Sequence, residues 1–378
     1  MKKLKILLAG GGTGGHLYPL VAVLEELYNL AAVNKFEFDI WYLGPHSVFD
    51  KDLEEHGVKI KGLVSSKYRR YFSVENILDV PKFAFSLLEA LFKLYFLMPD
   101  VVFSKGGPGA LAVVMAARFY VIPVIIHESD SVPGITNRIS AKFARKIGVS
   151  FRSSAKFFSK EKIAFVGNPI RADLLKELTD QNLAKRRLYF DPQDKLVLIL
   201  GGSQGSARIN EFILDNLDRL IVETQILHQA GPKNIDEIRK EVNVVLRDFD
   251  DVQKKKYHAV PYFDIEDLRE ALQAADLVVS RAGAGAIFEI AAFGKPSVLI
   301  PLSDAASDHQ RINAYEYAQT GAAIVIEEAN LLGTLFITQV KNILESPERL
   351  KKMSEAAKTF AKPQAARLIA EEIIRLAQ

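Results

Sequence analysis

The 378-residue sequence lacks cysteine altogether, which excludes disulfide bridges, thiolate metal ligands and a cysteine nucleophile. This composition is typical of a reducing compartment. Long apolar runs are also missing: the start, MKKLKILLAGGG, imitates a secretory signal, but its apolar stretch covers only residues 6–9 before the glycines. We therefore interpret the start as a first β-strand and expect the protein to be retained in the cytoplasm.

Two acidic signatures of cofactor and metal binding are missing as well. Gly10, Gly12 and Gly15 satisfy the G-x-G-x-x-G pattern of dinucleotide-binding turns. That pattern also needs an acidic residue at the end of the second strand to hold the ribose, whereas residues 42–45 read YLGP. No Asp-x-Asp metal site stands at a suitable strand end. We therefore expect no dinucleotide cofactor and no bound metal, and a turn that serves packing alone is the alternative.

Positive charge gathers in the first half of the chain. Residues 1–171 carry 23 Lys and Arg against 15 Asp and Glu, a net +8, and the remainder carries 26 against 31, a net −5. A basic half could meet an anionic membrane, a nucleic acid or an anionic substrate. Because the interleaved basic and aromatic pattern of RNA-binding modules is absent, we expect no nucleic-acid partner. The length indicates two or three globular domains.

The sequence does contain a glycine-rich turn that occurs twice. KLKILLAGGGTGGH covers residues 3–16 and KLVLILGGSQG covers residues 195–205, so Gly11 and Gly202 lie 191 residues apart. Each copy is an apolar run typical of a buried parallel strand, followed by glycines and a helical pattern. Ligands of open α/β sheets bind beyond the carboxyl ends of the strands. We predict an α/β fold of two Rossmann-like domains that face each other across a cleft holding the shared ligand.

Strands alternate with helical patterns in both halves, which predicts mainly parallel, doubly wound sheets. The expected strands cover residues 5–9, 36–43, 58–63, 101–104, 124–127, 147–150, 197–200, 225–230, 258–261, 277–280, 297–300 and 323–326. Early helices are expected from residue 20, over 76–97 and from 109. Gly-Asn-Pro at 167–169 interrupts the pattern, so we predict domains at 1–166 and 167–362. A final helix at 364–378 is expected to pack back on the first domain.

Three polar positions follow predicted strands. His16 follows the first glycines at a helix start, where a neutral imidazole can take a proton near pH 7, and a helix cap is the alternative. Small residues at 282–286 open another helix and expose N–H donors to a diphosphate, and Glu289 can accept both hydroxyls of a ribose. A surface ion pair with Lys295 is the alternative for Glu289. Residues 308–313 bring polar groups to a further strand-to-helix turn.

Residues 83–98, FAFSLLEALFKLYFLM, have more apolar helix surface than one sheet can cover. Ser86, Glu89 and Lys93 form one narrow polar stripe, which leaves roughly 260° of the circumference apolar. The stretch is too short and too charged to span a bilayer. Its basic and aromatic flank indicates a helix that rests on an anionic membrane surface, and a buried interdomain or dimer helix is the alternative. The expected membrane contacts are Phe85, Phe92, Arg69 and Arg70.

Seven motifs taken together resemble the MurG family of cell-wall glycosyltransferases. They are GGTGGH (11–16), SKGG (104–107), HESD with PGITN (127–137), GNPIR (167–171), GGSQG (201–205), SRAGA (280–284) with Glu289, and DHQRINA (308–314). Their joint order is highly specific and spans nearly the whole chain. This sequence has Ser129-Asp130 where many members have Gln-Asn, and Gly285 where many have a larger residue.

The resemblance implies a two-domain fold of the metal-independent (GT-B) glycosyltransferase type, without a cofactor. It implies inverting transfer of N-acetylglucosamine from UDP-N-acetylglucosamine to the 4-hydroxyl of the muramoyl sugar of undecaprenyl-diphospho-muramoylpentapeptide. The product is the disaccharide lipid precursor of peptidoglycan. The implied location is peripheral, at the cytoplasmic face of the cell membrane, and the implied partners are the two substrates and an anionic membrane surface.

The resemblance also assigns residues to roles. The implied catalytic residues are His16 and Asp130, one of which is the base for the acceptor hydroxyl. The implied donor-binding residues are Thr13, Gly14, Arg171, Ser203, Ile265, Ala284, Gly285, Ala286, Glu289, His309 and Gln310. The implied acceptor and phosphate loops contain Gly11, Gly12, Gly15, Gly106 and Gly107. Arg171 and helix N-termini would take the place of a metal at the diphosphate.

Three other functions stay open from the sequence. A UDP-N-acetylglucosamine 2-epimerase would share the fold but would need no lipid-facing helix. A glycosyltransferase with another lipid acceptor, such as diacylglycerol, is the nearest enzyme alternative. A binding subunit without activity is disfavoured, because both halves of the site stand in one chain.

Overall fold

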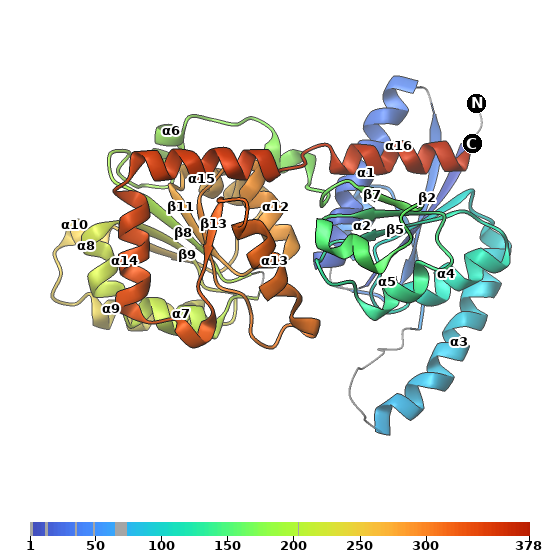
Figure 1. The fold of residues 1–378 in the computed structure, drawn as a ribbon, viewed down its shortest axis with the longest axis horizontal. Helices are drawn as coiled ribbons and strands as arrows, with labels where there is room; N and C mark the ends of the chain where they lie inside the picture. The colour runs from blue at the N-terminus through green and yellow to red at the C-terminus, as the bar shows by residue number, and fades with distance from the viewer. Residues whose placement is uncertain (1–2, 12–13, 35, 48–49, 65–73, 203) are drawn as a thin grey trace. The chain divides into compact units, whose positions relative to one another are not determined.

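The computed structural model describes residues 3–11, 14–34, 36–47, 50–64, 74–202 and 204–378 (Figure 1). The chain divides into two compact units: unit 1 comprises Met1–Ala172 and Lys362–Gln378, and unit 2 comprises Asp173–Ala361. Each unit is a parallel α/β sheet covered by helices, so the predicted pair of Rossmann-like domains is confirmed. The first boundary falls after Ala172, a few residues beyond the predicted junction, so the segment 167–171 belongs to unit 1.

The sheet of unit 1 has seven described strands, all parallel, in the order β3-β2-β1-β4-β5-β6-β7. They are β1 (Lys3–Ala9), β2 (Glu37–Gly44), β3 (Lys59–Gly62), β4 (Val101–Ser104), β5 (Val124–Glu128), β6 (Lys146–Val149) and β7 (Ile163–Phe165). The strand order reverses at β1, which pairs with β2 on one side and β4 on the other. Doubly wound sheets bind ligands at such a reversal. The sequence prediction missed β7, a three-residue strand at the edge of the sheet whose side chains are exposed or half-buried.

Helices cover both faces of this sheet, and β1 shows how they do so. Leu4, Ile6 and Leu8 pack into one core cluster and Leu7 and Ala9 into the other, because successive strand side chains point to opposite faces. The first cluster includes residues of α1 (Gly14–Asn34), α2 (Asp50–Glu55) and α16 (Ala365–Ala377), and the second those of α3 (Val74–Leu97) and α4 (Ala110–Phe119). The C-terminal helix α16 lies beside α1 in unit 1 (Figure 1). The remaining elements are α5 (Ile135–Ser140) and a 3-10 turn, Arg152–Phe157.

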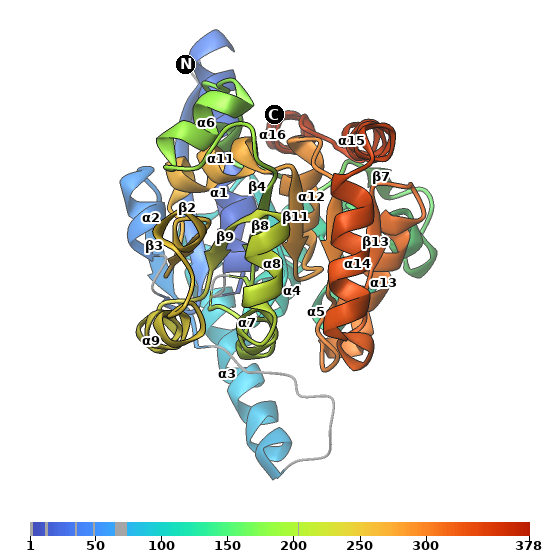
Figure 2. The same cartoon turned by 90° about the vertical axis from the view of Figure 1, so that its left-hand side faces the viewer.

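Unit 2 contains six described parallel strands in the order β10-β9-β8-β11-β12-β13. They are β8 (Leu196–Leu200), β9 (Gln225–Gln229), β10 (Tyr257–Val260), β11 (Leu277–Ser280), β12 (Ser297–Leu299) and β13 (Ala323–Val325). The helices are α6 (Gln181–Arg187), α7 (Ala207–Leu214), α8 (Leu217–Glu223), α9 (Ile235–Val245), α10 (Asp251–Lys254), α11 (Ile265–Ala274), α12 (Ala284–Ala292), α13 (His309–Ala318), α14 (Gly333–Leu344) and α15 (Pro347–Phe360) (Figure 2). The glycine turn after β8 therefore occupies the same position in its sheet as the turn after β1 does in unit 1.

The predicted start of the first helix was wrong. α1 begins at Gly14 and not near residue 20, and Pro19 lies inside it. A proline suggests a helix break in the sequence, but here it falls within the first two turns. Only the hydrogen bond from residue 19 to the carbonyl of residue 15 is lost at that place. His16 therefore stands in the first turn of a long helix.

The polar stripe of α3 faces the protein. Ser86 is 1% exposed, and the Glu89 carboxylate accepts a hydrogen bond from the Val64 N–H at 3.0 Å. The Lys93 ammonium lies 2.6 Å from the Glu89 carboxylate and donates to the Gly62 carbonyl. The stripe thus holds α3 against the end of β3 and leaves apolar side chains facing outward. Among the residues described, no helix is both long enough and apolar enough to cross a membrane.

Candidate active site

In unit 1 the turns after β1 and β4 pack against each other around His16. A Cβ atom at Gly11 would lie 2.9 Å from Pro108 and 3.0 Å from Nδ1 of His16. A Cβ atom at Gly107 would lie 2.8 Å from the Gly11 backbone, and Gly107 has a φ of 87°. Both positions therefore require glycine, as the two motifs suggested. Of the other predicted residues in the first turn, Gly12 and Thr13 lie outside the described residues, Gly14 begins α1 and Gly15 is exposed.

Tyr42 of β2 supports the first turn where a dinucleotide site would carry an acidic residue. Its hydroxyl donates a hydrogen bond to the Gly10 carbonyl at 3.0 Å. Burial raises the pKa of Tyr42, so the phenol keeps its proton and remains a donor. The end of β2, which lacks a carboxylate, thus stabilises the turn after β1 through this hydrogen bond.

The electrostatic surroundings of His16 favour a neutral imidazole. Burial, and then the positive charge of Lys105, lower its pKa to about 4, and the negative charge of Asp130 opposes them. A histidine with this pKa is unprotonated at pH 7 and can accept a proton. The structure therefore brings together the two predicted catalytic residues, His16 and Asp130, at the carboxyl edge of one sheet.

Glu128, at the end of β5, organises the turn that carries Asp130. Its carboxylate accepts hydrogen bonds from the N–H of Asp130 at 3.0 Å, the N–H of Gly134 at 3.3 Å and the amide of Asn137 at 2.9 Å. Burial and the neighbouring charge of Asp130 raise the pKa of Glu128. Both Glu128 and Asn137 lie within a sequence motif, but the motif alone does not indicate their role.

Gly106 is shaped by the same network. Its φ is 79°, and a Cβ atom there would lie 2.5 Å from Oδ1 of Asn137. That oxygen is buried and has no hydrogen-bond partner among the residues described. The predicted loop glycines Gly106 and Gly107 are thus both needed for close approach, one to Asn137 and one to Gly11.

Arg171 lies at the end of unit 1, beside α1. Its guanidinium stacks over the ring of Tyr18 at 4.3 Å from the ring centre. The Nε atom is buried and has no hydrogen-bond partner within the described parts of the chain. Cationic stacking on an aromatic ring fixes the direction of the guanidinium and leaves its N–H groups available for an anion.

In unit 2 the glycine turn after β8 packs against the end of β9. A Cβ atom at Gly201 would lie 2.8 Å from the Ser206 nitrogen, and Gly202 and Gly205 have φ angles of 90° and 77°. The amide of Gln229 donates to the Gly202 carbonyl at 2.8 Å. The predicted diphosphate contact Ser203 lies outside the described residues.

The predicted donor-binding helix α12 begins without a side-chain cap. Gly283 is its N-cap residue and, having no side chain, makes no capping hydrogen bond. Cβ atoms placed at Gly283 or Gly285 would meet no atom within 4 Å, so the helix start is open. Ala284 is buried and Ala286 half-buried, and Glu289 follows one turn later, half-buried. An open helix N-terminus of this kind favours an anionic ligand.

Arg281 joins three loops at the carboxyl edge of the unit 2 sheet. Its guanidinium lies 2.6 Å from the Glu328 carboxylate and donates to the Ser206 hydroxyl at 2.7 Å and to the Ile300 carbonyl at 3.2 Å. Glu328 also accepts a hydrogen bond from the Ser303 hydroxyl at 2.5 Å. The sequence analysis missed Glu328, because its partner stands 47 residues earlier and no motif joins them.

The remaining predicted donor contacts begin helices of unit 2. Ile265 is the first residue of α11 and His309 the first residue of α13. Asp308, just before α13, has a φ of 57°, and Gln310 accepts a hydrogen bond from the Leu302 N–H at 3.1 Å. The alternative partner for Glu289, Lys295, donates to the carbonyl oxygens of Gln273 and Ala275 at 2.9 and 2.8 Å. Within the described part of the chain, no cluster of three His, Asp or Glu residues could hold a metal ion.

Residues 6–149 match the N-terminal domain of glycosyltransferase family 28, and residues 196–369 match its C-terminal domain. The fold and these two matches define the protein as a glycosyltransferase. A UDP-N-acetylglucosamine–N-acetylmuramyl-(pentapeptide) pyrophosphoryl-undecaprenol N-acetylglucosamine transferase of Bacillus cereus is 35% identical over 95% of this chain and 94% of its own. Enzymes of the same name from Clostridium tetani and Clostridioides difficile are each 33% identical, over 94% and 99% of this chain and 94% and 89% of their own. The chain belongs to this transferase family, so the resemblance read from the seven motifs is confirmed.

Solved structures agree on the fold. Acinetobacter baumannii MurG has a TM-score of 0.74 at 24% identity and covers 98% of this chain and 99% of its own. A UDP-GlcNAc 2-epimerase from Neisseria meningitidis, bound to UDP-GlcNAc, has a TM-score of 0.68 at 15% identity and covers 98% of this chain and 100% of its own. At these identities the likeness concerns the fold alone.

Proposed function

We propose that the chain transfers N-acetylglucosamine from UDP-N-acetylglucosamine to the 4-hydroxyl of the muramoyl sugar of undecaprenyl-diphospho-muramoylpentapeptide, with inversion at the anomeric carbon. The observation that carries the proposal is 35% identity, over 95% of the chain, to an enzyme named for this transfer. In the reaction the acceptor oxygen bonds to the anomeric carbon while the bond from that carbon to UDP breaks. The acceptor proton passes to a base, and UDP leaves as the anion.

The donor is bound mainly by the carboxyl edge of unit 2. The open start of α12, with Ala284, Gly285 and Ala286, faces the UDP phosphates, and Glu289 accepts the ribose hydroxyls. The proposed contacts of the rest of the donor are Ile265 for uracil, His309 and Gln310 for the sugar hydroxyls, and Gly14, Thr13, Ser203 and Arg171 for the sugar and diphosphate. The stacked guanidinium of Arg171, with its buried Nε atom, supports an anionic ligand there. Positive charge at the leaving diphosphate lowers the barrier to its departure.

The proton acceptor is supplied by unit 1. His16 is the first candidate by its position at the start of α1, and its low pKa keeps the imidazole unprotonated. Asp130 is the second candidate, and its N–H donates to the Glu128 carboxylate that organises the turn after β5. The loops with Gly11, Gly12, Gly15, Gly106 and Gly107 bind the diphosphate and sugar of the acceptor.

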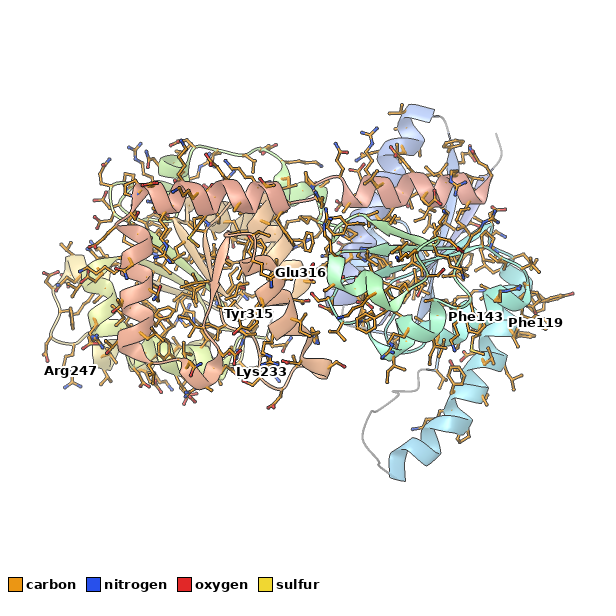
Figure 3. The ribbon with its side chains drawn as sticks, in the orientation of Figure 1. Phe119, Phe143, Lys233, Arg247, Tyr315 and Glu316 are labelled. Carbon is orange, nitrogen blue, oxygen red and sulfur yellow. The ribbon has the colours of Figure 1, made fainter. Side chains whose placement is uncertain are left out.

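The lipid acceptor requires that unit 1 rest on a membrane, since its hydrocarbon tail stays in the bilayer. The outward side of α3 and the end of α4 supply an apolar surface, which we call the α3–α4 face. Its members are Phe85, Leu88, Phe92, Tyr95, Phe96, Phe119 and Val121, each more than half exposed. Phe92 and Phe96 stack edge to face with ring centres 4.8 Å apart, and Figure 3 shows Phe119 at the outer side of the unit. Apolar side chains of this kind insert among lipid headgroups.

We propose that the α3–α4 face docks on the cytoplasmic leaflet, with the basic residues Arg69 and Arg70 nearby in sequence. These two arginines lie outside the described residues. Phe85→Glu with Phe92→Glu is expected to reduce flotation with anionic liposomes. The matched control is Val244→Glu with Val252→Glu, which adds the same charge at two exposed apolar positions of unit 2. Arg69→Glu with Arg70→Glu should make the remaining binding less sensitive to salt. Equal flotation of all three double variants would contradict membrane docking.

The transfer itself is tested with radiolabelled UDP-N-acetylglucosamine. We expect label to enter the butanol-extractable lipid only when the muramoyl-pentapeptide lipid is supplied. Label that enters lipid with diacylglycerol instead would establish the other lipid acceptor. Conversion of the donor to its 2-epimer without transfer would establish the epimerase, whose support here is the shared fold at 15% identity.

A further inference from the structure

Lys105, in the turn after β4, is a buried cation to which the proposed reaction gives no task. Its side chain is 3% exposed and donates a hydrogen bond to the Ser129 hydroxyl. Ser129 in turn donates to Oδ1 of Asn168 at 2.6 Å. Two side chains, Lys105 and Ser129, therefore connect the turn after β4 with the turn after β5 and with the segment that leads to Arg171.

Charged and titratable groups from three elements surround this ammonium. They are His16 in the first turn of α1, Glu128 at the end of β5 and Asp130 in the turn that follows. The charge of Lys105 lowers the pKa of His16 and opposes the rise in the pKa of Glu128. Both carboxylates in turn favour the charged ammonium, although burial lowers the pKa of Lys105 to about 8. His127, also buried, feels the same positive charge, which together with burial lowers its pKa.

A buried ammonium is costly to keep unless its neighbours compensate it. Here it contacts a hydroxyl, and its charge interacts with two acidic groups and with the imidazole expected to take the proton. A structural anchor would need only the contact with Ser129. The proximity of the positive charge to His16 and Asp130 gives this lysine an influence on the reacting groups that a neutral anchor would lack.

Resting on the transfer reaction proposed above, we propose that Lys105 is a positioning residue. Its ammonium fixes, through Ser129, the turn that carries Asp130, and it supplies the positive charge that His16 faces in unit 1. The two parts of this role separate by mutation. Lys105→Met removes both the contact and the charge, whereas Ser129→Ala removes the contact and leaves the ammonium in place.

The test compares kinetics with a direct titration of His16 by NMR of nitrogen-labelled imidazole, assigned with His16→Gln. Lys105→Met is expected to lower kcat roughly 10- to 100-fold while changing KM for UDP-N-acetylglucosamine much less, because the reacting groups and not the donor site are disturbed. Its His16 midpoint should rise above the value near 4, and the acid limb of the pH–rate profile should rise with it. Ser129→Ala should lower kcat less and leave the His16 midpoint in place. Lys142→Met, an exposed lysine of the same unit, is the matched control.

An unchanged kcat together with an unchanged His16 midpoint in Lys105→Met would overturn the proposal. If that variant does not fold, as judged by thermal unfolding, Lys105→Arg carries the test: the charge is retained, so the His16 midpoint should stay low, and a rise would overturn the proposal. A wild-type protein that transfers no sugar to the lipid would refute the proposed reaction. The NMR titration would still report on Lys105 in that case.

Discussion

The carboxyl edges of the two sheets are built from the same elements but carry different chemistry. In unit 1, the turns after β1, β4 and β5 enclose a histidine, a lysine and two acidic groups, and burial shifts the pKa values of His16, Lys105 and Glu128. In unit 2, the corresponding turns present an uncapped helix start and one arginine held by Glu328 and Ser206. The first edge is suited to moving a proton and the second to holding an anion.

This difference shows which structural features proton transfer and anion binding each require. Proton transfer needs a group with a shifted pKa, which requires burial among other charges. Phosphate binding needs oriented N–H groups, which an open helix start provides. Ribose binding needs one carboxylate near that helix start, and neither group has to be buried. Mutations in the two units should therefore affect different kinetic constants.

The largest effect is expected in unit 1. His16→Ala should lower kcat by about 100-fold or more while donor affinity changes little, because a general base contributes about 10²–10⁴-fold. Since the pKa of His16 is lowered to about 4, the base is unprotonated above that pH and activity should fall as the pH drops through it. The measurement is the pH–rate profile of wild type and variant. If the acid limb persists in His16→Ala and disappears in Asp130→Asn, the base is Asp130.

The next effect is expected in unit 2. Glu289→Ala should raise KM for UDP-N-acetylglucosamine and weaken UDP binding by about 1.5–3 kcal/mol, because a carboxylate that accepts ribose hydroxyls makes charge-assisted hydrogen bonds. Calorimetry with UDP measures the loss. Glu241→Ala, an exposed glutamate on α9, is the control and should bind UDP as the wild type does. Unchanged UDP affinity in Glu289→Ala would refute the assignment of Glu289 to the donor.

The contrast between the units also marks what could be predicted from the sequence. Both glycine turns follow buried apolar strands, and two strands, β4 and β11, both begin and end where the pattern placed them, because apolar runs bounded by glycine or charge are local signals. His16 and Glu289 could be proposed as site residues for the same reason, since each lies within a turn of a glycine-rich motif. Such signals depend only on residues near one another in sequence.

Lys105, Glu328 and the inward stripe of α3 could not be found in this way. A lysine between a strand and two glycines is expected to be exposed, but the turns after β1 and β5 pack beside Lys105 and it is buried. The Arg281–Glu328 ion pair joins loops after β11 and β13, two strands that are not neighbours in the sheet. The periodicity of α3 predicts the polar stripe but not its direction. The stripe faces the protein because Lys93 contacts Gly62 at the end of β3 and Glu89 contacts Val64 just after that strand.

A smaller effect on stability should separate the glycines of the two edges. Gly107→Ala is expected to destabilise the protein by at least about 1–2 kcal/mol, because a residue with a side chain resists the left-handed region and its Cβ would press on Gly11. Gly285→Ala should stabilise by less than about 1 kcal/mol, because its Cβ meets no neighbour and alanine favours a helix. Urea unfolding of the two variants measures both changes. A Gly107→Ala variant as stable as wild type would mean that the two turns can move apart.

The smallest effect is expected from removing metal ions. If the guanidinium of Arg171 and the start of α12 balance the charge of the diphosphate, the site already holds the positive charge that a divalent cation would bring. Transfer in excess EDTA should therefore proceed at the rate measured without it, whereas Arg171→Met should slow departure of UDP under both conditions. Loss of activity in EDTA, restored by magnesium or manganese, would show that Arg171 and the start of α12 do not suffice for the anion. In that case a divalent cation, and not the protein alone, would balance the charge of the leaving diphosphate.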